Sequence, residues 1–564
     1  MKKKLIIAAG VVLIITCGIF IYLKSRKLSD FSAVIREKLQ SAVIVGSDSL
    51  YRLEFDTLEA DVLKSKLIML NVRLIPDSLV VAKLDSDGRR PADVYKVFLK
   101  TLIIDGINVP DFISDKRINL DVLYISEPQL EICHKKPVLI NVAKDTAGLQ
   151  TVYQRISQEV NRLAVKKIIV QDMNVIHHNY LKNDEDKITK FNKVNIVFDD
   201  VLVDSLTQFD TTRFLYAKDA SISLGKMKLR TADSLYFINM DTISINALKK
   251  DVRIDGFAVV PRGSKEEFTR KLSFIKERYE NNFDHIIFKK IDWWGIVSDE
   301  SFEAEEAEIE HGKLTVYTDR NLPPYPKSKV GKYPHQLVMK SPVPLNIRKI
   351  KITDFDLTYE ELNPKSGKKG SLTFNNINGI ITNVTNDSEK IARDPLMKIN
   401  ASGQLMQSGS IKAEFVFNLA KADAGVFSVD VHLGTMDATK LNPVTQPLGL
   451  FKIDKANIKE LTAHVDGSNY KGTGSIKFLY DDLKIVILQP DNSSGQLKEK
   501  DLISFIANAF VLKSSNPKAG ETVREETAAY TRDVHKSFFN LIWKTILIGI
   551  MKTIGYEQGA KKVK

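Results

Sequence analysis

Histidine and acidic side chains are the first candidates for chemistry, because imidazole and carboxylate groups transfer protons and bind metals. The nine histidines of the chain are scattered, and the only adjacent pair is His177 and His178. Neighbouring residues of a strand point to opposite faces, so this pair would not meet at one ligand. The sequence also lacks the His-Glu-x-x-His and Cys-x-x-Cys spacings of zinc sites. We therefore predict no metal site.

Other catalytic motifs are missing as well. The sequence has no Gly-x-Ser-x-Gly elbow, no Walker A loop and no dinucleotide-binding glycine pattern. The acidic clusters at 184–186 and 303–308 are typical of a solvated turn and an exposed strand face. Trp293 and Trp294 beside Asp292 favour a packed strand end over a carbohydrate platform. We predict that the chain is not an enzyme and that it has no cofactor.

The composition is that of a folded protein with a mild basic excess. Apolar residues make up 43% and charged residues 27%, which excludes a disordered chain. Lys and Arg exceed Asp and Glu by 82 − 70 = 12, but the basic residues are dispersed singly, so nucleic-acid binding is not expected. Two cysteines, Cys17 and Cys133, allow at most one disulfide, which excludes a disulfide-framed secreted domain.

The N-terminal segment has the sequence of a membrane anchor. Residues 5–23 carry no charge and would rise ~28 Å as a helix, enough to cross the hydrocarbon core. The run ends in bulky residues at 20–23, which favours an uncleaved anchor over a cleaved signal peptide or a buried soluble helix. Lysines flank both ends, and the free amino group adds charge before the run, so we expect a cytoplasmic N-terminus. The predicted location is the inner (cytoplasmic) membrane, single-pass, with the bulk periplasmic.

A second apolar stretch, at residues 537–555, predicts an amphipathic helix. Lys544 and Lys552 would each cost about 2.5–3.5 kcal/mol at the centre of a bilayer, so a second crossing is not expected. An interfacial helix, or a helix that plugs a groove, fits the pattern better, and an ordinary core helix is the alternative. The residues predicted to contact a membrane are Phe538, Phe539, Trp543, Ile546 and Ile550.

Between about residues 28 and 488 apolar and polar residues alternate, which predicts β-strands. Many of these strands change phase once. In the clearest copy Ile350 and Ile352 share one face, and after Asp354 the apolar set restarts one residue early at Phe355. The same change of phase occurs at Gly106, Glu127, Asp172 and Gly256, with a looser copy at residues 309–316.

A change of phase inside a strand predicts a β-bulge or a tight corner, because one extra residue resets the alternation. We therefore predict a mainly β fold, with a long, bulged, mostly antiparallel sheet between the two terminal helices. Although 564 residues would usually suggest three or four domains, no boundary is visible inside the β region. The predicted parts are an anchor at 1–27, one β domain at 28–490 and a C-terminal helical segment at 491–564. Helical insertions are expected at residues 152–165, 265–282 and 501–513.

The strand pattern and the closing segments resemble the AsmA-like family of envelope proteins (the AsmA/TamB group), in the versions common in Bacteroidetes. As an architecture the likeness covers nearly the whole chain: one anchor, hundreds of residues of bulged strand and an apolar C-terminal helix. Its more specific parts are the Ile-x-Lys-Ile-x-Ile-x-Asp-Phe-type strands and the segments 502–517 and 538–554.

The resemblance implies a periplasmic β-sheet folded lengthwise into an elongated, β-taco-like groove. Its apolar lining would carry the acyl chains of phospholipids between the inner and outer membranes, as part of lipid transport and outer membrane biogenesis. The implied partners are phospholipids, the inner membrane at the N-terminal helix, and the outer membrane or an outer-membrane protein at the C-terminal helix. The family offers no catalytic motif to transfer.

The predicted lining comes from the repeated strands, on the premise that acyl chains cover their apolar face at about 0.8 kcal/mol per buried CH₂. Two other functions stay open: a non-catalytic envelope scaffold that binds a partner protein, and a cryptic enzyme or glycan-binding module. A filled interior would favour the scaffold, and a pocket with converging carboxylates or histidines would favour the enzyme. The residues predicted to bind lipid are Leu123, Ile125, Ile168, Val170, Ile350 and Ile352.

Overall fold

The computed structural model describes residues 31–561, apart from 62, 108–114, 136–152, 155–156, 158–159, 181–185, 211, 299–300, 492–495, 500–511, 557–558 and 560. The fold is mainly β, as predicted, with 57% strand and 17% helix, and the 25 described strands belong to one mixed sheet. The predicted anchor lies outside the described residues. Among the helices that the structure does describe, none is long and apolar enough to span a membrane.

The chain divides into two compact units. The first comprises the residues up to Leu229 together with Met240–Arg253, and the second comprises Arg230–Asn239 together with Ile254–Lys564. In the first unit β7 lies parallel to β5 and β6, and the other pairs are antiparallel: β1–β3, β2–β3, β3–β4, β4–β5, β4–β6, β7–β8, β8–β9 and β9–β12. Its elements are α2 (Phe31–Gly46), β1 (Tyr51–Glu54), β2 (Thr57–Asp61), β3 (Lys66–Pro76), α3 (Ser78–Ser86), β4 (Asp93–Asp105), β5 (Arg117–Ser126), β6 (Gln129–Lys135), β7 (Arg162–Tyr180), β8 (Asp186–Val203), η1 (Thr207–Phe209), β9 (Ala217–Leu224), β10 (Met227–Arg230) and β12 (Thr242–Asn246).

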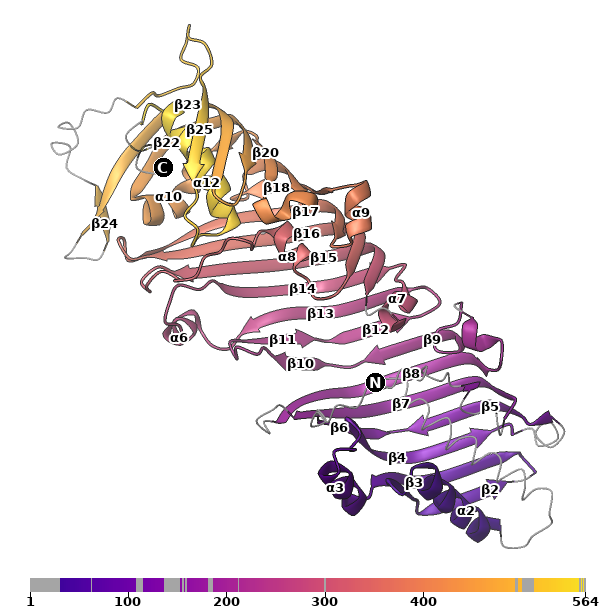
Figure 1. Ribbon diagram of the computed structural model, residues 1–564. Helices are drawn as coiled ribbons and strands as arrows, with labels where there is room; N and C mark the ends of the chain where they lie inside the picture. The colour runs from indigo at the N-terminus through magenta and orange to yellow at the C-terminus, as the bar shows by residue number, and fades with distance from the viewer. Residues whose placement is uncertain are drawn as a thin grey trace. The chain divides into compact units, whose positions relative to one another are not determined.

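In the second unit β15 and β16 are parallel, and the neighbouring pairs from β16 through β20 to β22, β23 and β25 are antiparallel. Strands β13 to β16 lie side by side, with the short helices α6 and α7 at opposite strand ends (Figure 1). The elements are β11 (Tyr236–Met240), β13 (Asp251–Pro261), α6 (Lys265–Arg270), β14 (Arg278–Lys289), α7 (Trp293–Ser298), β15 (Phe302–Asp319), α8 (Pro334–Met339), β16 (Leu345–Asn363), β17 (Lys368–Thr385), α9 (Ser388–Arg393), β18 (Leu396–Leu405), β19 (Gly409–Asn418), η2 (Leu419–Ala424), β20 (Phe427–Leu433), β21 (Met436–Asp437), η3 (Ala438–Leu441), α10 (Asn442–Gly449), β22 (Phe451–Gly467), β23 (Lys471–Pro490), β24 (Leu497–Glu499), β25 (Glu525–Thr531) and α12 (Phe538–Thr553).

Each unit has its own hydrophobic core. In the first, Leu39 and Val43 of α2 are buried with Leu67 and Ile104 of the sheet. In the second, α12 packs against β22, β23 and β25, and α10 packs against β17 and β22. Helix α2 differs from the prediction, in which the β region begins at about residue 28.

The predicted bulges in β7 and β16 are confirmed, and the other three predicted positions have the same left-handed backbone. Backbone φ is positive at all five predicted positions, with values of 74° at Gly106, 46° at Glu127, 55° at Asp172, 62° at Gly256 and 54° at Asp354. The pairing of β16 with β17 shifts register around Phe355, and that of β7 with β8 shifts around Met173. A single left-handed residue therefore resets the alternation, and the apolar residues before and after it stay on one face.

An asparagine of the neighbouring strand satisfies the backbone at several bulges. The backbone N–H of Asp172 donates to Asn195 Oδ1 at 2.9 Å, and that of Asp354 donates to Asn378 Oδ1 at 3.2 Å. Asp354 Oδ2 also lies 2.9 Å from Nδ1 of His311, which has a positive φ itself. These side chains replace ladder hydrogen bonds that a bulge interrupts.

Two helical predictions are wrong in part. In the predicted helix 152–165, residues from Arg162 onward belong to β7, where Leu163 pairs with Val203. In the predicted helix 265–282, α6 ends at Arg270 and β14 begins at Arg278. Pairing within the sheet outweighs helical periodicity in both segments. In the third predicted helix, 501–513, residues 501–511 lie outside the described part of the chain.

One buried histidine has an unusual environment in the core of the second unit. His335 of α8 is fully buried, and neither ring nitrogen has a hydrogen-bond partner among the described residues. Its ring lies against Phe417, with the centroids 4.9 Å apart. Burial lowers the pKa of His335 to about 4, so the imidazole is neutral at pH 7.

The first prediction concerns this histidine. Since the pKa is about 6.5 in an unfolded chain and about 4 in the fold, the unfolded state takes up the proton first as pH falls. Stability should therefore fall by up to about 3 kcal/mol between pH 6.5 and 4. His335→Phe should remove this part of the loss in denaturant unfolding. His464→Phe, at an exposed histidine, should leave it; an unchanged pH profile in His335→Phe would contradict the assignment.

The second prediction concerns the bulge in β16. A β-branched residue in the left-handed region is strained, so Asp354→Val should lower the free energy of unfolding by about 1–2 kcal/mol. Thr353→Val, at the preceding residue of the same strand, is the matched control and should be near neutral. Chemical denaturation of both variants measures the difference, and equal losses would show that the bulge does not depend on residue 354.

Candidate functional site

The strands β14 to β17 present apolar side chains on one face, in rows that run across the sheet. In the middle row Phe283 is opposite Gly312, Gly312 is opposite Phe355, and Phe355 is opposite Ile377. The flanking rows of β14 to β17 are Phe288, Ala307, Ile350 and Ile381; Ile286, Ile309, Ile352 and Gly379; Asn281, Leu314, Leu357 and Phe374; and Tyr279, Val316, Tyr359 and Leu372. These five rows are called the apolar face below.

The middle row shows how bulges and packing act together. The rings of Phe283 and Phe355 are stacked, with centroids 5.9 Å apart, and Phe257 of β13 lies 6.1 Å from Phe283. A Cβ on Gly312 would lie 2.6 Å from both Phe283 and Phe355, so the two rings close over a position that has no side chain. Phe355 and Phe257 each follow a residue with positive φ. The result is a continuous aromatic surface across four strands.

The opposite face of the same strands is charged. Lys289 Nζ lies 2.6 Å from Glu308 Oε2, and Lys349 Nζ lies 3.4 Å from Glu306 Oε2. Such partly exposed pairs contribute little to stability, but they keep this face soluble. This part of the sheet is therefore amphipathic: one face suits water and the other suits an apolar ligand or neighbour.

The sheet of the second unit is covered unevenly. In β20 the buried Phe427 and Val429 alternate with exposed residues, which is typical of a strand under a core. In β13 every residue before Pro261 is partly exposed, and in β14 no residue after Arg278 is fully buried. The apolar side chains of β13 and β14 thus keep contact with solvent, whereas the sheet under α12 and α10 has a filled interior.

The six residues predicted to bind lipid lie on three strands, β5, β7 and β16. In the first unit Leu123 pairs with Ile168, and Ile125 pairs with Val170. Leu123 is buried in the core, and Ile125 and Ile168 are partly buried beside it. In the second unit Ile350 and Ile352 stand in two rows of the apolar face, and both are partly exposed. The structure brings the residues together in rows within each unit.

The five residues predicted to contact a membrane divide between two sides of α12. Phe538 and Ile546 are buried in the core and Ile550 packs against it, so one side of α12 is that of a core helix. Phe539 and Trp543 are 62% and 51% exposed. Large apolar side chains at this exposure are available to a partner or a bilayer.

The second unit also has a concavity of about 890 Å³, lined by residues of β16 to β20, β22, β23 and β25. His464 Nδ1 lies 2.7 Å from Asp430 Oδ1, which raises the pKa of His464, while its Nε2 lies 3.3 Å from Asp466 Oδ2. Ser475 is the cross-strand neighbour of His464, but its hydroxyl has no hydrogen-bond partner among the described residues. Ser475 and His464 therefore lack the hydrogen bond that joins a nucleophile to its base. The described residues contain no cluster able to hold a metal.

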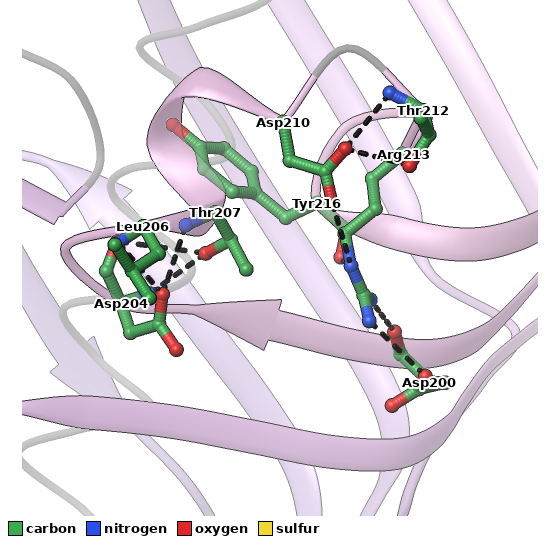
Figure 2. A network of polar contacts seen from close by, with 8 residues as sticks. All are labelled: Asp200, Asp204, Leu206, Thr207, Asp210, Thr212, Arg213 and Tyr216. Carbon is green, nitrogen blue, oxygen red and sulfur yellow. Dashed lines mark hydrogen bonds and ion pairs between the residues drawn. The ribbon is translucent and has the colours of Figure 1, made fainter.

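A polar network of the first unit closes a loop. Between β8 and β9, Arg213 reaches Asp200 and Asp210, while Asp204 accepts from the backbone of Leu206 and Thr207 (Figure 2). A hydrogen bond from the Thr212 side chain lowers the pKa of Asp210. Asp200 belongs to the end of β8 and the other partners lie in the connection to β9, so the network orders this turn.

The aromatic row and the asparagines at the bulges were missed from the sequence. The signal for the row was present, because an apolar residue follows each bulge position. Comparisons with known proteins add no family here: no family model matches the chain, and no curated protein matches it.

Proposed function

We propose that the chain is a non-enzymatic lipid-transfer protein of the cell envelope that carries phospholipid acyl chains on its apolar face. The observation that carries the proposal is the contrast between the two sides of β14 to β17. One side is paired and charged, while the other is apolar and, at β13 and β14, is not fully buried. Acyl chains are ligands of matching chemistry.

The free energy of burying apolar groups supports an acyl chain as the ligand that covers the apolar face. Each CH₂ group that leaves water for an apolar surface contributes about 0.8 kcal/mol. The five rows of the apolar face contain no charged residue, so an acyl chain laid on this face would meet mostly apolar side chains. A polar ligand would have to leave its hydrogen bonds unmade on this face.

The proposal includes a place in the cell. We infer an inner-membrane anchor at residues 5–23, with the described chain in the periplasm, and a second contact through the exposed side of α12 to the outer membrane or one of its proteins. Support comes from the uncharged run in the sequence and from the exposure of Phe539 and Trp543.

A scaffold is the second candidate. The observation in its favour is the filled interior beneath α12, where Phe417, Phe427 and Phe538 are packed against one another. A closed, dry interior carries no lipid, so this part of the second unit would suit a rigid platform for a partner protein.

The third prediction tests the lipid. The full chain, purified in mild detergent, should retain phospholipid in mass spectrometry. Phe355→Asp should reduce the retained amount about tenfold, because a carboxylate under an acyl chain is poorly solvated. Thr358→Asp, on the charged face of the same strand, is the matched control and should retain lipid. A chain without lipid, or equal retention by both variants, would refute transfer along this face.

The fourth prediction tests the exposed side of α12. In proteoliposomes, a chain with Trp293→Phe and Trp294→Phe keeps Trp543 as its one tryptophan. Its fluorescence should be quenched by lipids brominated near the headgroup, since aromatic rings concentrate at that depth. The reciprocal variant Trp543→Phe should show little quenching. If brominated lipid does not quench the fluorescence of Trp543, the proposed contact between α12 and the membrane is wrong.

A further inference from the structure

The apolar face ends beside a charged pair, Glu361 of β16 and Arg320, which directly follows β15. Beyond the bulge, Phe355, Leu357, Tyr359 and Glu361 follow one another at every second position, so they share one side of the strand. The hydroxyl of Tyr359 donates to Glu361 Oε2 at 2.5 Å, and Arg320 Nη2 lies 2.9 Å from the same oxygen. A lipid whose tails lay on the apolar face along β16, from one row to the next, would reach these groups with its polar end.

Two lysines next to this group have no acidic partner. Lys536, just before α12, and Lys544, on α12, are partly buried, and no carboxylate of the described residues lies within 4 Å of either ammonium group. Burial, and then the charge of Arg320, lower the pKa of Lys536. Burial also lowers the pKa of Lys544, with Glu361 opposing and Arg320 adding to the effect.

The remaining charges nearby do not compensate these lysines. Glu361 is already paired with Arg320, and Glu277 is paired with Lys329. Asp533 raises the pKa of Lys536, but burial and the charge of Arg320 lower it more. The Nε of Arg320 is buried and has no hydrogen-bond partner among the described residues. Three cationic side chains thus have unused hydrogen-bond donors at this end of the apolar face.

We propose that Arg320, Lys536 and Lys544 bind the phosphate of a phospholipid headgroup while its acyl chains lie on the apolar face. The inference rests on the proposed function and adds the headgroup class to it. A phosphate has acceptor oxygens for both ammonium groups and for the guanidinium, whose planar donors match its geometry. Its negative charge supplies what the two lysines lack. Free inorganic phosphate has the same chemistry, and the experiment separates the two sources.

The test uses the full chain, freed of lipid in detergent. The protein is offered equal amounts of phosphatidylglycerol and diacylglycerol with identical acyl chains, and the bound lipids are quantified by mass spectrometry. The chain should retain phosphatidylglycerol at least about tenfold over diacylglycerol, since each charge-assisted hydrogen bond exceeds a neutral one in strength. The double variant Lys536→Gln with Lys544→Gln should lose that preference and keep diacylglycerol binding.

Two further variants control for folding and for general charge. Lys552→Gln removes a lysine of the same helix that already donates to the Thr527 carbonyl, and it should keep the preference. Lys536→Arg with Lys544→Arg keeps both charges and should keep the preference too. The thermal transition of the double Gln variant should be unchanged or higher, because two partly buried, unpaired charges are removed.

The outcomes separate the inference from the proposed function. Equal retention of both lipids by the natural chain, or an unchanged preference in the double Gln variant, overturns the headgroup site and leaves acyl binding intact. Calorimetric binding of inorganic phosphate that the double variant loses, with no change in lipid preference, assigns the cluster to free phosphate and also overturns it. Retention of neither lipid overturns the proposed function itself.

Discussion

The left-handed residue in the middle of the strands is the constraint on which the rest of this structure depends. A strand of 18 or 19 residues twists, and strict alternation along β7 or β16 would have to hold one face apolar over its whole length. One residue with positive φ, at Asp172 or Asp354, resets the alternation and bends the strand. Because neighbouring strands carry their bulges at matching places, the apolar residues on either side of them form rows across the sheet.

Those rows explain why one part of the second unit is a buried core while another part stays partly exposed. Where α12 and α10 pack on the sheet, the rows become a core, and even His335 is held there as a neutral ring between aromatic neighbours. At β13 and β14 the same kind of row remains partly exposed. A protein that only needed stability would bury this surface, so its exposure is what favours a ligand with long apolar chains, and the cationic group beyond Tyr359 favours a ligand with a phosphate at one end.

The sequence predicted the strands and their bulges because both are local: alternation has period two, and a phase change at Asp354 or Gly256 is visible in ten residues. It did not predict which side would be covered, since that depends on helices such as α12 that arrive from far along the chain. It overestimated helix near Arg162 and Arg278, where sheet partners outweigh periodicity. The cationic group at Arg320 could not be found from the sequence, because Arg320 and Lys544 are 224 positions apart (544 − 320) and influence each other electrostatically only in the fold.

The most direct measurement is photo-crosslinking at two adjacent residues of β16 in the full chain, in its native membranes. Leu357 belongs to the apolar face and pairs with Leu314, whereas Thr358 points to the charged face. Phospholipid adducts are expected from a photoreactive residue at position 357 and none above background from position 358. Protein adducts alone at 357, or equal lipid labelling at both positions, would contradict lipid transfer on the apolar face.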